Sequence, residues 1–162
     1  MNISKWNNIY LNNKRLDNVF IEKYGDLNTL FNKNCIGLLV ELGEFVNETK
    51  VFKYWSIKKS NRDLILEEYA DTITSVLVFY NMLNLEIKEP KNHLKTNDIL
   101  ELFNYLFSQT SKLMNNFSVD LVIDIFNNLF YVKELLDIEE DEIIEIIIKK
   151  QRIVEERLNS EY

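Results

Sequence analysis

The chain has 162 residues, 46% of them hydrophobic, and a formal net charge of −7 at pH 7. This length is enough for one hydrophobic core, and the acidic balance excludes a general nucleic-acid binder, which needs clustered Lys and Arg. A single cysteine, Cys35, excludes an internal disulfide and fits a reducing compartment. We therefore expect one domain over residues 1–162.

The sequence shows no signal for a membrane partner. The most apolar window, residues 143–148, is far shorter than the roughly 20 residues that a bilayer requires. The segment from Met1 to Trp6 lacks the charged start and apolar run of a secretory signal. A cytoplasmic protein is the expectation.

Apolar spacing predicts helices along the chain, because three Gly and one Pro leave few positions for the tight turns of a β-rich protein. The predicted helices span residues 4–24, 28–49, 62–84, 97–116, 118–137 and 139–158. Asp26 or Asn28 can cap the second helix, and the third has Asn61 or Ser60 as its candidate cap. Ser118 suits the start of the fifth helix. The fold class is therefore all-α, a multi-helix bundle.

Two connecting segments and one acidic run complete this organisation. The loop 50–61 mixes aromatic and basic residues between the second and third helices. The connection 85–96 contains Pro90, which interrupts a helix, and His93, for which we expect a surface position and no catalytic role. The acids at positions 139–142 suit a helix N-terminus, where the helix dipole favours negative charge.

Four carboxylates are the most informative feature of the chain. Glu41 and Glu44 are spaced i, i+3 on the second predicted helix, and Glu68 and Asp71 share that spacing on the third. The spacing puts both acids of a pair on one helix face, and Glu41 lies in line with apolar positions. Buried like charges need a cation or a proton, so two facing pairs would form an all-oxygen site for Mg²⁺ or Mn²⁺. The alternative is a pair of solvated helix faces in an acidic protein.

Three segments around these acids carry a family resemblance. ELGEFVNE at 41–48, FKYWS at 52–56 and EEYAD at 67–71 together resemble the signature of the all-α, dimeric-type dUTPases, which belong to the MazG-like nucleoside triphosphate pyrophosphohydrolases. The ExxE and ExxD patterns alone would indicate only the wider group, whereas the FKYWS run points to the dUTPase branch. The resemblance implies a MazG-like/dimeric dUTPase fold, with a four-helix metal-binding core plus C-terminal helices, and a homodimer.

The resemblance also implies a metal site and a base. The implied ligands of Mg²⁺, with Mn²⁺ as the alternative ion, are Glu41, Glu44, Glu68 and Asp71. Glu41 is in addition the implied base for the attacking water. The chemistry agrees, because divalent ions neutralise triphosphate oxygens and lower the pKa of bound water, so that a carboxylate can accept its proton.

Candidate substrate contacts lie in the aromatic loop and near the N-terminus. The resemblance places Trp55 at the site, where it could stack against the nucleobase or close the pocket, and makes Lys53 and Lys58 candidates for phosphate contacts. Solvated charges are the alternative for the lysines, and a helix anchor or a dimer contact is the alternative for Trp55. Asn13 stands where the family more usually has a Gln whose amide reads the uracil edge. The shorter amide keeps donor and acceptor but reaches less far.

The C-terminal segment matches the family motif incompletely. Lys150, Arg157 and Tyr162 keep the spacing of residues that close over the nucleotide, and the resemblance makes them substrate-binding candidates. Val154 and Leu158 replace an expected Asn and Gln, so two polar contacts are missing.

Together these features predict a Mg²⁺-dependent enzyme that hydrolyses dUTP to dUMP and pyrophosphate and so removes dUTP from the nucleotide pool. dUDP is a second candidate substrate. One alternative is a MazG-like pyrophosphohydrolase of another nucleoside triphosphate. The other, motivated by Val154 and Leu158, is a catalytically inactive helical interaction protein that retains the family core. The expected partners are the nucleotide and a second copy of the chain, with no nucleic acid and no membrane.

Overall fold

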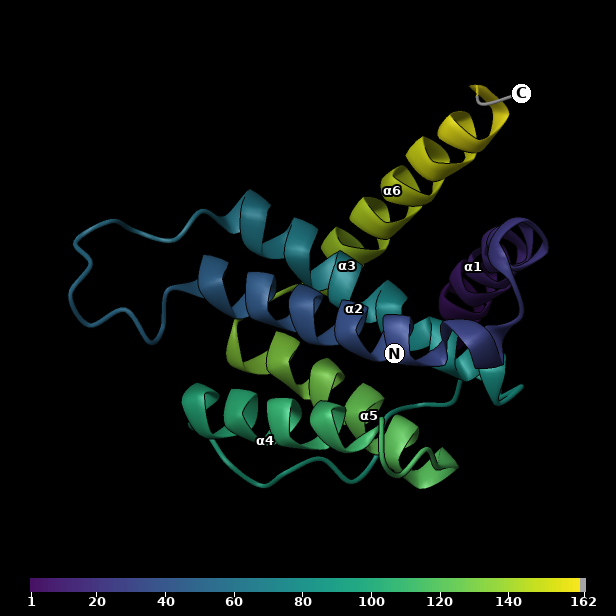
Figure 1. Cartoon of the computed structure of the whole chain (residues 1–162). Helices are drawn as coiled ribbons and strands as arrows, with labels where there is room; N and C mark the ends of the chain where they lie inside the picture. Colours follow the sequence, from purple (N-terminus) through teal and green to yellow (C-terminus); the bar gives the residue numbers. More distant parts are fainter. Residues whose placement is uncertain (161–162) are drawn as a thin grey trace.

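The structure, a computed structural model, describes residues 1–160, except for the side chains of Leu27 and Asn28. This part of the chain contains six helices and no strand (Figure 1): α1 (Ile3–Tyr24), α2 (Leu27–Thr49), α3 (Arg62–Met82), α4 (Ile99–Lys112), α5 (Val119–Leu135) and α6 (Glu140–Ser160). None of these helices is long and apolar enough to cross a bilayer. The predicted all-α bundle is confirmed.

Polar side chains fix where the helices begin. Asp26, Asn61 and Ser118 each accept a hydrogen bond from a backbone N–H in the first turn of the helix that follows. The predicted helix 97–116 was too long at both ends. Asp98 caps α4, which therefore begins at Ile99, two residues after the predicted start. At the other end, a tighter hydrogen bond from the Leu113 N–H to the Thr110 carbonyl ends the α-helical pattern early.

The six helices pack in two groups. α1, α2, α3 and α6 form the first group, in which α3 contacts the other three, and α4 and α5 pack together against α2 and α3. The long helices α2 and α3 run along each other through the centre of the bundle (Figure 1). The buried rings of Phe45 and Tyr69 stack across them with centroids 5.0 Å apart, and the Tyr69 hydroxyl donates to the Leu129 carbonyl at 2.7 Å. This packing sets which faces of α2 and α3 meet.

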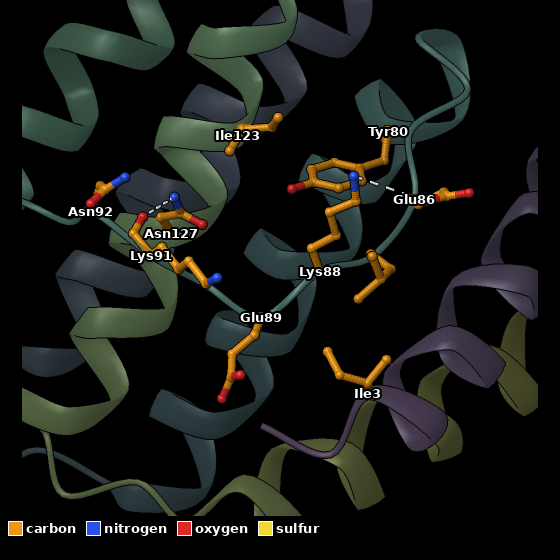
Figure 2. Close-up of a pocket in the computed structure, with 10 residues that line it drawn as sticks. Ile3, Tyr80, Glu86, Lys88, Glu89, Lys91, Asn92, Ile123 and Asn127 are labelled. Atoms are coloured by element: carbon orange, nitrogen blue, oxygen red, sulfur yellow. Dashed lines mark hydrogen bonds and ion pairs between the residues drawn. The ribbon is translucent and has the colours of Figure 1, made fainter.

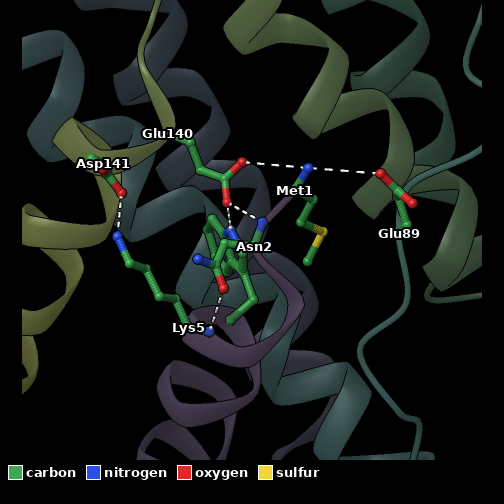
Figure 3. Close-up of polar contacts among 7 residues, drawn as sticks. Met1, Asn2, Lys5, Glu89, Glu140 and Asp141 are labelled. Carbon is green, nitrogen blue, oxygen red and sulfur yellow. Dashed lines mark hydrogen bonds and ion pairs between the residues drawn. The ribbon is translucent and has the colours of Figure 1, made fainter.

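Polar contacts tie the start of α1 to the start of α6 (Figure 3). The Met1 amino group lies 3.7 Å from a carboxylate oxygen of Glu140, and Trp6 Nε1 donates to Glu140 at 3.1 Å. Lys5 Nζ lies 2.6 Å from Asp141. These contacts hold the starts of α1 and α6 together. The later turns of both helices therefore pack against α3 next to each other.

Candidate functional site

Carboxylates from α2 and α3 gather where these helices lie side by side. One oxygen each from Glu41, Glu44 and Glu68 lies within 4.8 Å of the others. Within residues 1–160, none of these three carboxylates takes part in a hydrogen bond or an ion pair. The i, i+3 spacing on α2 explains why Glu41 and Glu44 share the face that meets Glu68. We call these three residues the acid cluster.

Electrostatic repulsion within the acid cluster is visible in the pKa values. Burial, and then the charges of Asp71 and Glu44, raise the pKa of Glu41 above its ordinary value. The pKa of Glu68 is raised by the same causes in the same order. Glu41 and Glu68 are half-buried and Glu44 is exposed, so the acids are less buried than the apolar pattern predicts. The cluster is negatively charged, made only of oxygen donors, and open to an ion from solvent.

Asp71, the fourth predicted acid, lies beside the acid cluster and has a partner of its own. Its charge contributes to the raised pKa of both Glu41 and Glu68. Its carboxylate accepts a hydrogen bond from Nζ of Lys150 on α6. The structure thus brings together a predicted metal ligand and a predicted substrate-binding cation.

A pocket of about 190 Å³ lies next to Asp71, between α1, α3 and α6. Its lining includes Asn13 from α1 and Lys150 from α6, both of which the sequence marks as substrate-binding candidates. Val154 gives the pocket an apolar wall where the family motif has an Asn. We call this the α1–α3–α6 pocket.

Sequence reasoning missed Asp17, which lines this pocket, and Asn81, which donates a hydrogen bond to Asp17. Nδ2 of Asn13 lies 3.3 Å and 3.4 Å from the two carboxylate oxygens of Asp17, and Nδ2 of Asn81 lies 3.4 Å from one of them. Burial raises the pKa of Asp17 to about 6, although the hydrogen bonds from both amides act in the opposite direction. The i, i+4 spacing of Asn13 and Asp17 is a local signal that could have revealed this pair.

The remaining C-terminal candidates lie farther along α6. Arg157 lines a second pocket, of about 350 Å³, together with Asp71 and Lys150. Two predicted cations of α6 therefore line a pocket together with Asp71. Tyr162 lies outside the described residues.

The aromatic loop 50–61 extends beyond the ends of α2 and α3 (Figure 1). Trp55 is 63% exposed and contacts Tyr54 edge to face, with ring centroids 4.9 Å apart. Lys58 is exposed, and Lys53 Nζ lies 5.6 Å from the centre of the Phe52 ring. Trp55, Lys53 and Lys58 line neither pocket beside Asp71, so their role at the site stays a prediction.

A larger pocket, of about 530 Å³, lies elsewhere, between the start of α1, the connection 85–96 and α5 (Figure 2). Its lining includes both acidic and basic side chains, such as Glu86 and Lys88, and none of the predicted site residues. The largest of these pockets and the predicted site residues therefore lie in different parts of the molecule.

Comparison with known proteins identifies the family of the chain. A family model described as dUTPase matches residues 5–162, a range that includes every predicted site residue. No curated protein and no solved structure matches the chain at a significant level. The family match confirms the resemblance drawn from the three sequence segments, and the all-helical fold is consistent with it. The chain therefore belongs to the dUTPase family and is an enzyme that hydrolyses dUTP.

Proposed function

We propose that the enzyme converts dUTP to dUMP and pyrophosphate in a Mg²⁺-dependent reaction at the junction of α2, α3 and α6. The observation that carries this proposal is the acid cluster, whose three carboxylates lie within 4.8 Å of one another and, in residues 1–160, have no cationic partner. The α1–α3–α6 pocket lies next to it, with Asp71 as the shared neighbour. dUDP is a second candidate substrate.

The donor set fits a hard divalent cation. Glu41, Glu44, Glu68 and Asp71 supply only carboxylate oxygens, which Mg²⁺ and Mn²⁺ prefer over softer ligands. A cation would also remove the repulsion that raises the pKa of Glu41 and Glu68. When bound, Mg²⁺ neutralises phosphate oxygens and lowers the pKa of water.

Glu41 is the proposed base. One of its carboxylate oxygens lies within 4.8 Å of oxygens of Glu44 and Glu68, next to the place that a cation and its bound water would take. It would take the proton of the attacking water on a carboxylate oxygen. Its half-buried position keeps this oxygen beside the other acids rather than in bulk solvent.

We propose that the uracil ring enters the α1–α3–α6 pocket and that the phosphates lie at Asp71 and Lys150. The pocket is small, about 190 Å³, and suits one ring rather than a whole nucleotide. Asn13 would face the base, whereas Lys150 and Arg157 would contact the phosphates. Lys150 would leave Asp71 to do so.

Residues outside this pocket would complete the site. Trp55, Lys53 and Lys58 would reach the nucleotide once the loop 50–61 folds over it, and Tyr162 would close over it from the C-terminal end.

We also propose a homodimer. Ile36 and Val40 are 51% and 49% exposed and lie one turn apart on the same face of α2, an arrangement that a second copy could cover. We further propose that residues 1–162 form one domain, and that the enzyme acts on the nucleotide pool of the cytoplasm.

Product analysis tests the proposal directly. The purified protein is incubated with Mg²⁺ and separately with dUTP, dCTP, dTTP and dATP, and the release of monophosphate and pyrophosphate is measured, with EDTA as the control. We expect dUTP to be hydrolysed fastest and EDTA to stop the reaction. If dUTP is turned over no faster than the other nucleotides, the assignment to dUTP fails in favour of another nucleoside triphosphate.

A binding measurement separates the enzyme from an inactive relative. A non-hydrolysable dUTP analogue with Mg²⁺ should raise the Tm, because any ligand of the folded state stabilises it by mass action. A protein that neither hydrolyses dUTP nor gains stability from the analogue would be an interaction protein that keeps only the fold.

A further inference from the structure

Asn13, Asp17 and Asn81 form a hydrogen-bonded group in which the direction of each bond is fixed. A carboxylate only accepts hydrogen bonds, whereas an amide has one donating and one accepting end. Asn13 and Asn81 both turn Nδ2 toward Asp17, from α1 and α3 respectively. The two asparagines are only 7% and 9% exposed, so water does not easily replace these bonds. The amide of Asn13 is thus held by a partner that tolerates only one orientation.

This arrangement uses the Nδ2 end of the Asn13 amide and does not use its Oδ1. Within residues 1–160 it has no hydrogen-bond partner, and Asn13 lines the α1–α3–α6 pocket together with Asp17. The pocket is therefore offered a fixed acceptor. A ligand that enters the pocket must present an N–H or O–H group to Oδ1 of Asn13. If it presented a second acceptor instead, neither atom would have a hydrogen bond in this poorly solvated site.

We infer that Asp17 is a positioning residue that fixes the polarity of the Asn13 amide and thereby makes the enzyme select uracil over cytosine. The inference rests on the proposed function, in which Asn13 faces the base. Uracil carries an N–H at ring position 3, which donates to Oδ1 of Asn13. Cytosine carries a bare nitrogen there, so that two acceptors would face each other. Asp17 itself need not touch the nucleotide.

The chain contains a matched pair for comparison on α5. Nδ2 of Asn128 lies 3.1 Å from Oδ1 of Asp124, again with i, i+4 spacing, and Asp124 is half-buried with a pKa raised by burial. There the amide oxygen is already used, because Oδ1 of Asn128 accepts the Leu94 N–H at 2.8 Å. On α5, the Asn–Asp pair therefore holds the connection 85–96 through Leu94. On α1, the corresponding pair leaves Oδ1 of Asn13 without a partner within the described residues.

The test compares Asp17→Asn with Asp124→Asn, using kcat and KM for dUTP and dCTP. With Asn at position 17 the Asn13 amide is free to rotate, so we expect the ratio of kcat/KM for dUTP to that for dCTP to fall by about tenfold or more. The fall should come from a higher KM for dUTP with kcat largely kept. The Asp124→Asn ratio should stay within about twofold of wild type.

The outcomes separate the inference from the function on which it rests. A wild-type enzyme that prefers dUTP, with Asp17→Asn keeping the same ratio, would overturn only the role of Asp17. A wild-type enzyme without preference for dUTP over dCTP would overturn both. Asp17→Asn should fold, because a neutral amide removes a buried charge whose pKa is raised to about 6.

A second measurement needs no substrate. The side-chain NH₂ signals of Asn13 and Asn81 are followed by NMR between pH 4.5 and pH 7.5, and both should move together around the pKa of Asp17, about 6. The movement should vanish in Asp17→Asn, which separates it from effects of the other ionisable side chains nearby, those of Tyr10, Asp71 and Lys150. Signals that do not move together, or that still move in Asp17→Asn, would overturn the inference.

Discussion

Two groups of acidic residues in this enzyme have similar composition and opposite surroundings. At the start of α6, every acid of the run Glu140, Asp141 and Glu142 has a cation: the Met1 amino group, Lys5 and Arg62 respectively (Figure 3 shows the first two). The acid cluster between α2 and α3 has no such partner within the described residues. Local charge density therefore does not distinguish them, whereas their partners do.

The pKa values show what this difference means. The hydrogen bond from Arg62 holds the pKa of Glu142 below its ordinary value, so the charged form of Glu142 favours folding. Burial and neighbouring acids raise the pKa of Glu41, so its charged form opposes folding in the absence of a cation. The charges of the first group stabilise the fold. The negative charges of the acid cluster repel one another, and a bound cation can remove this repulsion.

Neutralising one acid in each group should give the largest contrast. Glu44→Gln should lower kcat for dUTP by about 10³-fold, because it removes a ligand of the proposed metal site. Asp141→Asn should stay within about twofold of wild type, because its ion pair with Lys5 is exposed. Pyrophosphate release measures both, with circular dichroism as the check on folding. Full activity in Glu44→Gln would eliminate the proposed metal site.

Lys150 offers the next test, because its charge reaches the acid cluster and lowers the pKa of Glu41 and Glu68. Lys150→Gln should raise the KM for dUTP by about tenfold through the loss of a phosphate contact, with a smaller effect on kcat. Arg152, an exposed cation of α6 that lines neither pocket beside Asp71, provides the control variant, Arg152→Gln, for which we expect no change in KM. Equal effects of the two substitutions would point to a general charge effect instead.

Mg²⁺ should stabilise the folded enzyme through the acid cluster alone. At about 100 times its Kd, Mg²⁺ should raise the Tm by about 5–10 °C, as mass action and the size of the chain require. The shift should disappear in Glu41→Gln and persist in Asp141→Asn. Differential scanning fluorimetry measures it, with NaCl of equal ionic strength as the reference. A shift that survives in Glu41→Gln would place the ion elsewhere.

The smallest effects are expected for thermal stability without metal. Neutralising one acid in each group should change the Tm in opposite directions. At pH 7.5, Glu41→Gln should raise the Tm by about 2–4 °C, a modest value because the half-buried carboxylate is partly screened by solvent. The gain should shrink as the pH falls through the raised pKa of Glu41, because the wild-type residue then takes up a proton itself.

Glu142→Gln should behave in the opposite way. The lowered pKa of Glu142 means that its charged form stabilises the fold above the ordinary glutamate pKa, so the substitution lowers the Tm at pH 7.5. This loss should vanish in acid, where the wild-type carboxylate is protonated too. Thermal unfolding of both variants without metal, across this pH range, checks the signs. Changes of the same sign would remove the contrast between the two groups.

The sequence alone was sufficient for features that depend on neighbours in the chain. Helix positions follow from apolar spacing and from caps such as Asn61, and the shared face of Glu41 and Glu44 follows from their i, i+3 spacing. The segments that carry the family resemblance are equally short, and the family match confirms it. Each of these features reflects a hydrogen bond or a repeat within a few residues.

Only the tertiary structure decided which of these residues meet. Lys150 reaches Asp71 across 79 positions, and Asn81 reaches Asp17 across 64, because α3 packs against both α6 and α1. Trp55, close in sequence to both acid pairs, lies instead on a loop beyond the ends of their helices. Such contacts depend on how buried faces of separate helices fit together, a property of the whole bundle that no local spacing encodes.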